Sequence, residues 1–304
     1  MKRYKKMLVC LDGSRHDAPL VAYAGGRSQV AESEEIHFLH VVEEAPAPPD
    51  EGGPAEVTSD TIAALVAERF SGHGGEKTAY EVVRGARLLE SLRYAYEKDI
   101  DLIVLSRHYA RKTDEDDEAL LARRITRKAT CSVLVLPEDY ARQADELIVP
   151  VRDSDCSAQA LEVACGVAEV TGARVTALNI FPVHGGYSRV GKTLEEHTAL
   201  LKAAAERECD NLLERTDTHG VTVTCNCLPD MGDDPVGVIL DVLGDGQGKA
   251  VVIGARGRSG AAGVLLGNVT EQLIRRAPSP VAAVKKKGEQ VGIIQALLML
   301  AGQG

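Results

Sequence analysis

Short apolar segments and helical segments alternate regularly along this chain, and the whole alternation occurs twice. In the first half, strands are predicted at residues 6–11, 36–42, 78–83, 102–105 and 133–136, and helices at 17–30, 58–70, 86–96 and 119–129. In the second half, strands are predicted at 147–151, 173–180, 221–227, 250–253 and 281–284, and helices at 157–170, 194–215, 235–243 and 271–276. Strands that alternate with helices form parallel sheets with right-handed crossovers. The sequence therefore predicts two α/β domains in tandem.

The two halves correspond position by position. Asp12-Gly13-Ser14 matches Arg152-Asp153-Ser154 at an offset of 140, and Val133 matches Val281 at an offset of 148. We expect a first domain at residues 1–138, a second at 145–287, and an apolar tail at 288–304. A helix formed by the tail would be apolar almost all round and would need to be buried. Either it packs on its own protein, or it docks a partner protein or a second subunit.

Composition excludes several classes of function. The chain has 304 residues, enough for two domains, and a net charge of −10 that argues against nucleic acid as a partner. No segment is long enough to span a membrane, and the apolar run after the basic N-terminus is too short for a signal peptide. The seven cysteines show no metal-binding spacing and favour a reducing compartment. We therefore expect a cytoplasmic protein.

A glycine-rich stretch from Gly254 to Thr270 follows the predicted strand 250–253 and ends where a helix begins near Asn268. A strand, a glycine loop and a helix N-terminus together can hold phosphate, because open N–H groups and the positive end of the helix dipole converge there. The alternative is a turn whose glycines only reverse the chain. The nearby segment 244–249 looks like a P-loop but lacks the Ser or Thr after its lysine, and it precedes a strand rather than a helix.

The spacing of these glycines resembles a known family signature. Gly254-x-x-Gly257, nine residues and then Gly267 is similar to the ATP-binding pattern of the universal stress proteins. Their pattern continues with Ser or Thr, where this chain has Asn268. The sequence Leu8 to Ser14 and the residues around Pro280-Val281 also fit, so the resemblance covers nearly the whole chain as two copies.

The resemblance implies a fold and an assembly. Each half would be a doubly wound, five-stranded parallel sheet with helices on both faces, Rossmann-like and similar to the adenine nucleotide alpha hydrolases. Members of the family dimerise through the last strand. The two halves of this chain would then imitate such a dimer through residues 133–136 and 281–284, and the chain would also form a homodimer.

The resemblance also implies a site in the second half. The residues that it assigns to an adenine nucleotide, ATP with or without Mg²⁺, are Gly254, Gly257, Gly267, Asn268, Val269, Thr270, Ile180, Arg152 and Asp153. Arg256 lies inside the glycine loop, where its guanidinium either pairs with a phosphate or has a surface role. Asn268 is an acceptable replacement, because Asn is a good helix N-cap and its amide can donate to phosphate. Arg152 stands where the family has an Asp that contacts the ribose or adenine region. Three outcomes stay open: Asp153 takes that role, Arg152 meets phosphate, or ribose binding is lost.

The first half has the opposite pattern. Asp12 is present, but Ser106, Tyr109 and Ala119 replace the glycines, and Leu120 replaces the Ser or Thr. The acidic run at residues 114–118 lies in the same loop and would repel phosphate. We expect no nucleotide in the first domain.

The resemblance favours a nucleotide-dependent stress-response regulator. ATP hydrolysis would be slow at most, since no general base can be named. One rival hypothesis is a nucleotide-free interaction module that acts through its dimer surface or its tail. Another is a small-molecule or metal binder that uses the cleft of the first half.

Overall fold

A computed structural model describes residues 4–43, 57–109, 120–138, 140, 142–183, 193–255 and 266–287. Its internal contacts divide the chain into two compact units. Among the described residues, the first unit runs to Gln143 and also includes residues 285–287, whereas the second contains residues 144–255 and 266–284. The tail at 288–304, the acidic run at 114–118, and Arg256 and Gly257 lie outside the described residues.

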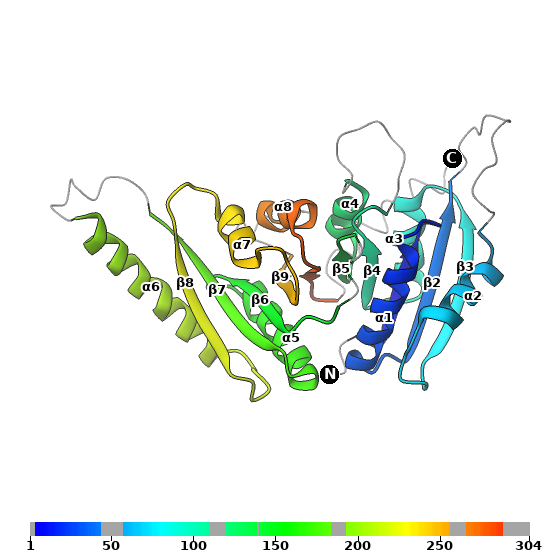
Figure 1. Ribbon diagram of the computed structural model, residues 1–304, viewed down its shortest axis with the longest axis horizontal. Coiled ribbons are helices and arrows are strands. Elements are labelled where there is room, and N and C mark those ends of the chain that lie inside the picture. The colour runs from blue at the N-terminus through cyan, green and yellow to red at the C-terminus, as the bar shows by residue number, and fades with distance from the viewer. Residues whose placement is uncertain are drawn as a thin grey trace. The chain divides into compact units, whose positions relative to one another are not determined.

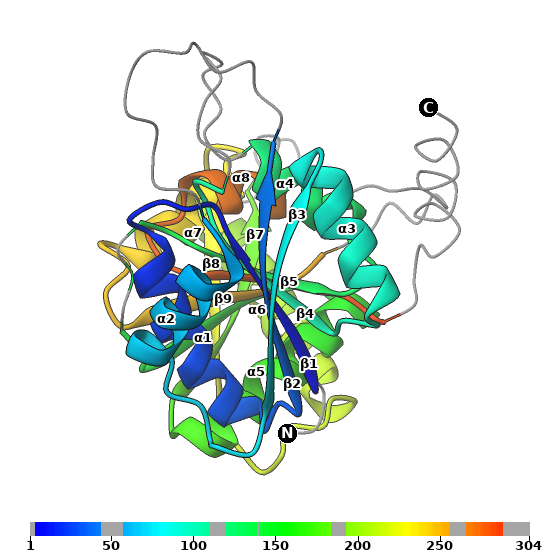
Figure 2. The ribbon, with the colours of Figure 1, turned by 90° about the vertical axis from the view of Figure 1, so that its right-hand side faces the viewer.

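The first unit alternates strands and helices as the apolar pattern predicts (Figure 1). Its elements are β1 (Lys6–Leu11), α1 (Asp17–Ala31), β2 (Glu35–Val42), α2 (Ser59–Arg69), β3 (Lys77–Arg84), α3 (Arg87–Glu97), β4 (Leu102–Ser106), α4 (Leu120–Lys128) and β5 (Ser132–Leu136). The strands are parallel and lie in the order β3-β2-β1-β4-β5. Helices α1 and α2 cover one face of the sheet, and α3 and α4 cover the other (Figure 2).

The second unit repeats this topology. Its elements are β6 (Glu146–Val151), α5 (Asp155–Thr171), β7 (Arg174–Pro182), α6 (Leu194–Glu214), β8 (Val223–Asp230), α7 (Pro235–Leu243), β9 (Lys249–Gly254), α8 (Asn268–Arg276) and β10 (Val281–Val284). The parallel order is β8-β7-β6-β9-β10. Helices α5 and α6 pack on one face, and α7 and α8 pack on the other (Figure 1). Two five-stranded, doubly wound α/β units confirm the predicted fold class.

The central strands form the core of each unit. Leu8 of β1 pairs in register with His37 on one side and Ile103 on the other, and Leu147 of β6 pairs with Val175 and Ala250 in the same way. These strands are almost completely buried because helices cover both faces, which explains their continuous apolar sequences. In each unit the first two crossovers place strands on one side of the central strand, β1 or β6, and the next ones place strands on its other side. Ligands of such folds bind at this switch point, at the carboxyl ends of the strands.

Candidate functional site

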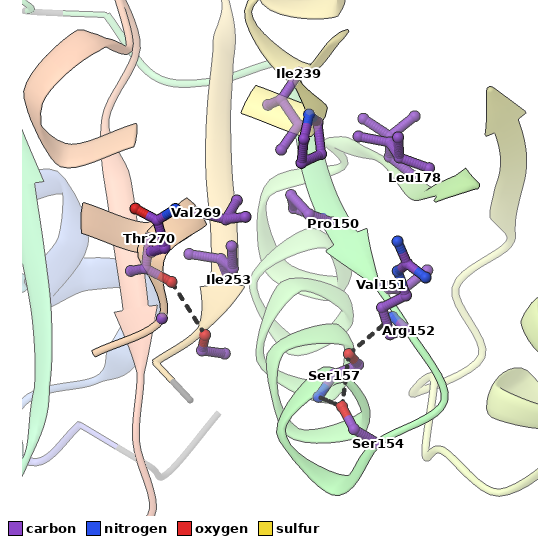
Figure 3. Close-up of a pocket in the computed structure, with 15 residues that line it drawn as sticks. Pro150, Val151, Arg152, Ser154, Ser157, Leu178, Ile239, Ile253, Val269 and Thr270 are labelled. Atoms are coloured by element: carbon purple, nitrogen blue, oxygen red, sulfur yellow. Dashed lines mark hydrogen bonds between the residues drawn. The ribbon is translucent and has the colours of Figure 1, made fainter. Parts of the chain in front are cut away.

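A cavity of about 340 Å³ lies in the second unit, at the carboxyl ends of β6, β7 and β9 (Figure 3). The first turns of α5, α7 and α8 complete its wall. Its lining consists of Pro150, Val151, Arg152, Ser154, Ser157, Leu178, Ile180, Pro235, Ile239, Ile253, Gly254, Gly267, Asn268, Val269 and Thr270. A volume of this size and a mainly apolar wall with a few polar groups are typical of small-molecule sites.

The turn from β6 into α5 forms one side of the cavity. Ser154 is the N-cap of α5, and its hydroxyl accepts a hydrogen bond of 3.2 Å from the Ser157 N–H. The Ser157 hydroxyl accepts in turn from the Arg152 N–H at 3.0 Å. These bonds fix the backbone of Arg152 at the mouth of the cavity. Serine caps are favoured because their short side chains reach these backbone donors.

The first turn of α8 forms the opposite side. The Gly267 N–H donates to the Ala255 carbonyl at 3.1 Å, and the Thr270 hydroxyl donates to the Gly254 carbonyl at 3.4 Å. These bonds hold the helix start against the end of β9. The next N–H groups, those of Asn268 and Val269, belong to the first helical turn and have no acceptor within the helix. They supply donors and the positive end of the helix dipole at the cavity wall.

One detail of this helix start differs from expectation. The N-cap of α8 is Gly267, so Asn268 is the first helical residue and does not cap the helix. The Asn268 side-chain oxygen instead accepts a hydrogen bond from Gln272 at 3.2 Å. Asn268 is still exposed at the cavity, where its backbone N–H is one of the open donors.

Gly254 has a packing role as well as a place in the lining. A Cβ at this position would lie 2.7 Å from the carbonyl oxygen of Cys156 and 2.8 Å from its Cβ. Both distances are much shorter than van der Waals contact. Glycine is therefore required here by the close approach of β9 to the first turn of α5, whatever the cavity binds.

The structure separates Arg152 from Asp153. Arg152 lines the cavity, whereas Asp153 points elsewhere and is absent from the lining. The Asp153 carboxylate accepts a hydrogen bond of 2.7 Å from the guanidinium of Arg215, the C-cap residue of α6. Ile180, near the end of β7, is buried in the wall.

Of the ten site residues expected from the sequence, the structure brings seven together around the cavity: Arg152, Ile180, Gly254, Gly267, Asn268, Val269 and Thr270. Arg256 and Gly257 lie outside the described residues. Sequence reasoning missed the apolar wall from Pro150, Leu178, Ile239 and Ile253. It also missed Ser154 and Ser157, although a Ser three residues before another polar residue at a helix start is a recognisable capping signal.

The corresponding region of the first unit is occupied by side chains. The same turn recurs there, since the Asp12 N–H donates to the Asp17 carboxylate at 3.1 Å just as the Arg152 N–H donates to Ser157. However, Tyr109 is only 1% exposed, and its hydroxyl shares a hydrogen bond of 3.1 Å with Ser91.

The described residues contain no group of three or more His, Cys, Asp or Glu side chains arranged to hold a metal ion. All seven cysteines are free, and five of them are buried. Within the same residues, no helix is long and apolar enough to cross a membrane.

Fold and cavity together define a class of protein: a tandem doubly wound α/β protein with a cavity at the carboxyl ends of the strands in its second unit. A sequence model of the Universal stress protein family matches residues 3–137 and again residues 144–285. The chain therefore belongs to the universal stress protein family, as a tandem member.

Relatives agree with this assignment. Universal stress protein MJ0531 of Methanocaldococcus jannaschii is 24% identical over 149 residues, which are 46% of this chain and 82% of that protein. A universal stress protein from Archaeoglobus fulgidus has a similar fold, with a TM-score of 0.65 at 19% identity over 93% of this chain and 97% of its own. A putative universal stress protein from Pseudomonas aeruginosa gives a TM-score of 0.64 at 16% identity over 98% of both chains.

Proposed function

We propose that the second unit binds an adenine nucleotide, ATP with or without Mg²⁺, and that the protein acts as a nucleotide-dependent regulator in a stress response. The observation that carries this proposal is the cavity of about 340 Å³, which combines an apolar wall with the open N–H groups of α8. An adenine ring suits apolar residues such as Leu178 and Ile180, and a phosphate group suits a helix N-terminus.

The residues present fit such a ligand. No carboxylate occurs among the described residues that line the cavity, so none of them repels phosphate. The glycine spacing from Gly254 to Gly267 adds support from the sequence. A Mg²⁺ ion would be held by the phosphate oxygens, since the described lining provides no acidic ligand for it. We also propose little or no hydrolysis, because no described residue of the lining is placed as a general base.

Calorimetric titration with ATP and Mg²⁺ tests the proposal, together with a search for adenine nucleotide released when the purified protein is denatured.

The sharpest variant is Val269→Glu, which puts a carboxylate in the first turn of α8 beside the open donors. An acidic residue there is compatible with the helix dipole, so folding should persist while ATP binding falls at least tenfold.

Val170→Glu is the matched control, because Val170 lies near the end of α5, is 53% exposed and is not in the cavity lining. It should bind ATP like the wild type. Absence of ATP binding in the wild type, with no nucleotide released, would contradict the proposal and favour the nucleotide-free interaction module. Gly257→Val should also abolish binding if the second unit holds the nucleotide.

We also propose a homodimer in the cytoplasm, with the two halves of each chain imitating a dimer of single domains. A partner protein at residues 288–304 is part of this proposal. Light scattering of the full chain, compared with a chain truncated after Lys287, tests both the dimer and the part played by the tail.

A further inference from the structure

Arg152 brings a positive charge to one side of the cavity. It is exposed at the end of β6, and among the residues that the structure describes no carboxylate pairs with its guanidinium. Figure 3 shows it across the cavity from Val269 and Thr270 of α8, with Pro150 and Ile253 between them. The cavity thus has a cationic group on one side and open helix donors on the other.

The acidic residues nearest to Arg152 in the sequence are engaged elsewhere. Asp153 and Asp155 both accept hydrogen bonds from Arg215, at 2.7 and 3.1 Å. Neither of them lines the cavity. The positive charge of Arg152 is therefore left for a ligand, whereas Arg215 is paired with two carboxylates.

A ligand that uses both sides needs two separate anionic groups on an apolar body. The 5′-phosphates of a nucleotide account for one side only, at α8. A guanidinium binds phosphate strongly, through paired charged hydrogen bonds, and gains much less from a neutral hydroxyl. The second anionic group would therefore sit on the part of the nucleotide that reaches β6.

We propose that the cavity selects adenine nucleotides that carry a phosphate on the ribose ring in addition to the 5′ position, and that Arg152 binds that ribose phosphate. This inference rests on the proposed nucleotide site. It names the class of nucleotide and the residue that selects it.

Three isomers test it, because each carries two phosphates: adenosine 5′-diphosphate, adenosine 3′,5′-bisphosphate and adenosine 2′,5′-bisphosphate. Calorimetric titration of the wild type should show one ribose-phosphorylated isomer binding roughly tenfold or more tightly than adenosine 5′-diphosphate, as one charged hydrogen-bonded contact provides. The comparison between the 2′ and 3′ isomers locates the phosphate.

Arg152→Gln should bring all three isomers to similar affinities, and Arg152→Asp should reverse the order in favour of adenosine 5′-diphosphate. Arg174→Gln is the matched control. Arg174 lies at the start of β7, its side chain is 76% exposed, and it contacts Glu146 at 3.4 Å rather than the cavity. Thermal unfolding of each variant confirms that it is folded.

The outcomes separate this inference from the proposed function. If adenosine 5′-diphosphate and ATP bind at least as tightly as the ribose-phosphorylated isomers, the inference is wrong and the nucleotide site stands. If the preference persists in Arg152→Gln, the role of Arg152 is wrong. If no adenine nucleotide binds to the wild type, both proposals fail.

Discussion

At Gly254 the backbone of β9 comes so close to α5 that no side chain fits between them. The sequence suggested a phosphate-binding glycine, and the structure adds a packing reason that needs no ligand. The carbonyl oxygen of Cys156 occupies the space that a Cβ would take, at 2.7 Å. A requirement for glycine at position 254 would therefore reflect packing against α5 as well as ligand binding.

Gly254→Ala should destabilise the second unit by about 1–3 kcal/mol, because the added methyl group overpacks the contact with Cys156. Urea unfolding measures the change. Gly232→Ala is the control, since a Cβ on Gly232 would meet no atom within 4 Å and the residue has no positive φ. An equal effect of the two substitutions would show that the close contact with α5 does not matter.

Asp17 is the residue whose charge depends most clearly on its surroundings. Burial, and then the neighbouring Asp12 carboxylate, raises the pKa of Asp17 from 3.8 to about 7. The folded chain therefore holds this proton more tightly than the unfolded chain does. The contribution of Asp17 to stability is most favourable below pH 4 and is lost as the pH rises from about 4 to about 7.

The wild type should lose roughly 2–3 kcal/mol more stability than Asp17→Asn between pH 5 and pH 8, measured by urea unfolding at each pH. Asp60→Asn, which removes an exposed carboxylate from the first turn of α2, should keep the pH dependence of the wild type. Parallel pH profiles for the wild type and Asp17→Asn would contradict a raised pKa at Asp17.

At the scale of elements, the end of α4 depends on a residue far away in the sequence. Lys285 follows β10, belongs to the first unit and is only 8% exposed. Its ammonium group donates to the carbonyls of Thr126, Arg127 and Ala129 at the end of α4. A cation is favourable there, because the last carbonyls of a helix lack partners and form the negative end of its dipole.

Lys285→Met should lower the free energy of unfolding by about 2–3 kcal/mol, because buried carbonyls lose their donor and the helix end loses its cation. Lys286→Met is the control, since Lys286 is exposed, and it should change stability by less than about 0.5 kcal/mol. Similar losses in the two variants, measured by chemical denaturation, would mean that the carbonyl contacts contribute nothing specific.

At the scale of the whole molecule, the two halves share a topology but differ at the ends of their strands. The turn after β1 and the turn after β6 have the same hydrogen bond, yet Tyr109 is buried in the first unit where the second has its cavity. Duplicated units can diverge in this way, because the core strands fix the fold and the loops are free to change.

We therefore expect one adenine nucleotide per chain. Equilibrium titration of the full chain should saturate at that ratio, and Val269→Glu should remove the whole signal rather than half of it. Two sites per chain, or half of the binding left in Val269→Glu, would mean that the first unit also binds nucleotide.

From the amino-acid sequence one can predict the fold class and seven of the fifteen described residues that line the cavity. Continuous apolar segments such as Leu102–Leu105 predict buried parallel strands, because each side of such a strand must be covered by helices. The glycine spacing then located Gly254, Gly267 and the start of α8. These features are local, so a single pass along the chain can find them.

The remaining properties of the cavity and of the two units depend on residues that are distant in sequence and meet only in the packed fold. The pairing of Asp153 with Arg215 joins positions 62 residues apart and draws that carboxylate away from Arg152 at the cavity. The contact of Gly254 with Cys156, the burial of Tyr109 and the hydrogen bonds from Lys285 to α4 arise in the same way. The spacing of residues along the sequence does not predict such contacts, since they form only when the strands and helices pack.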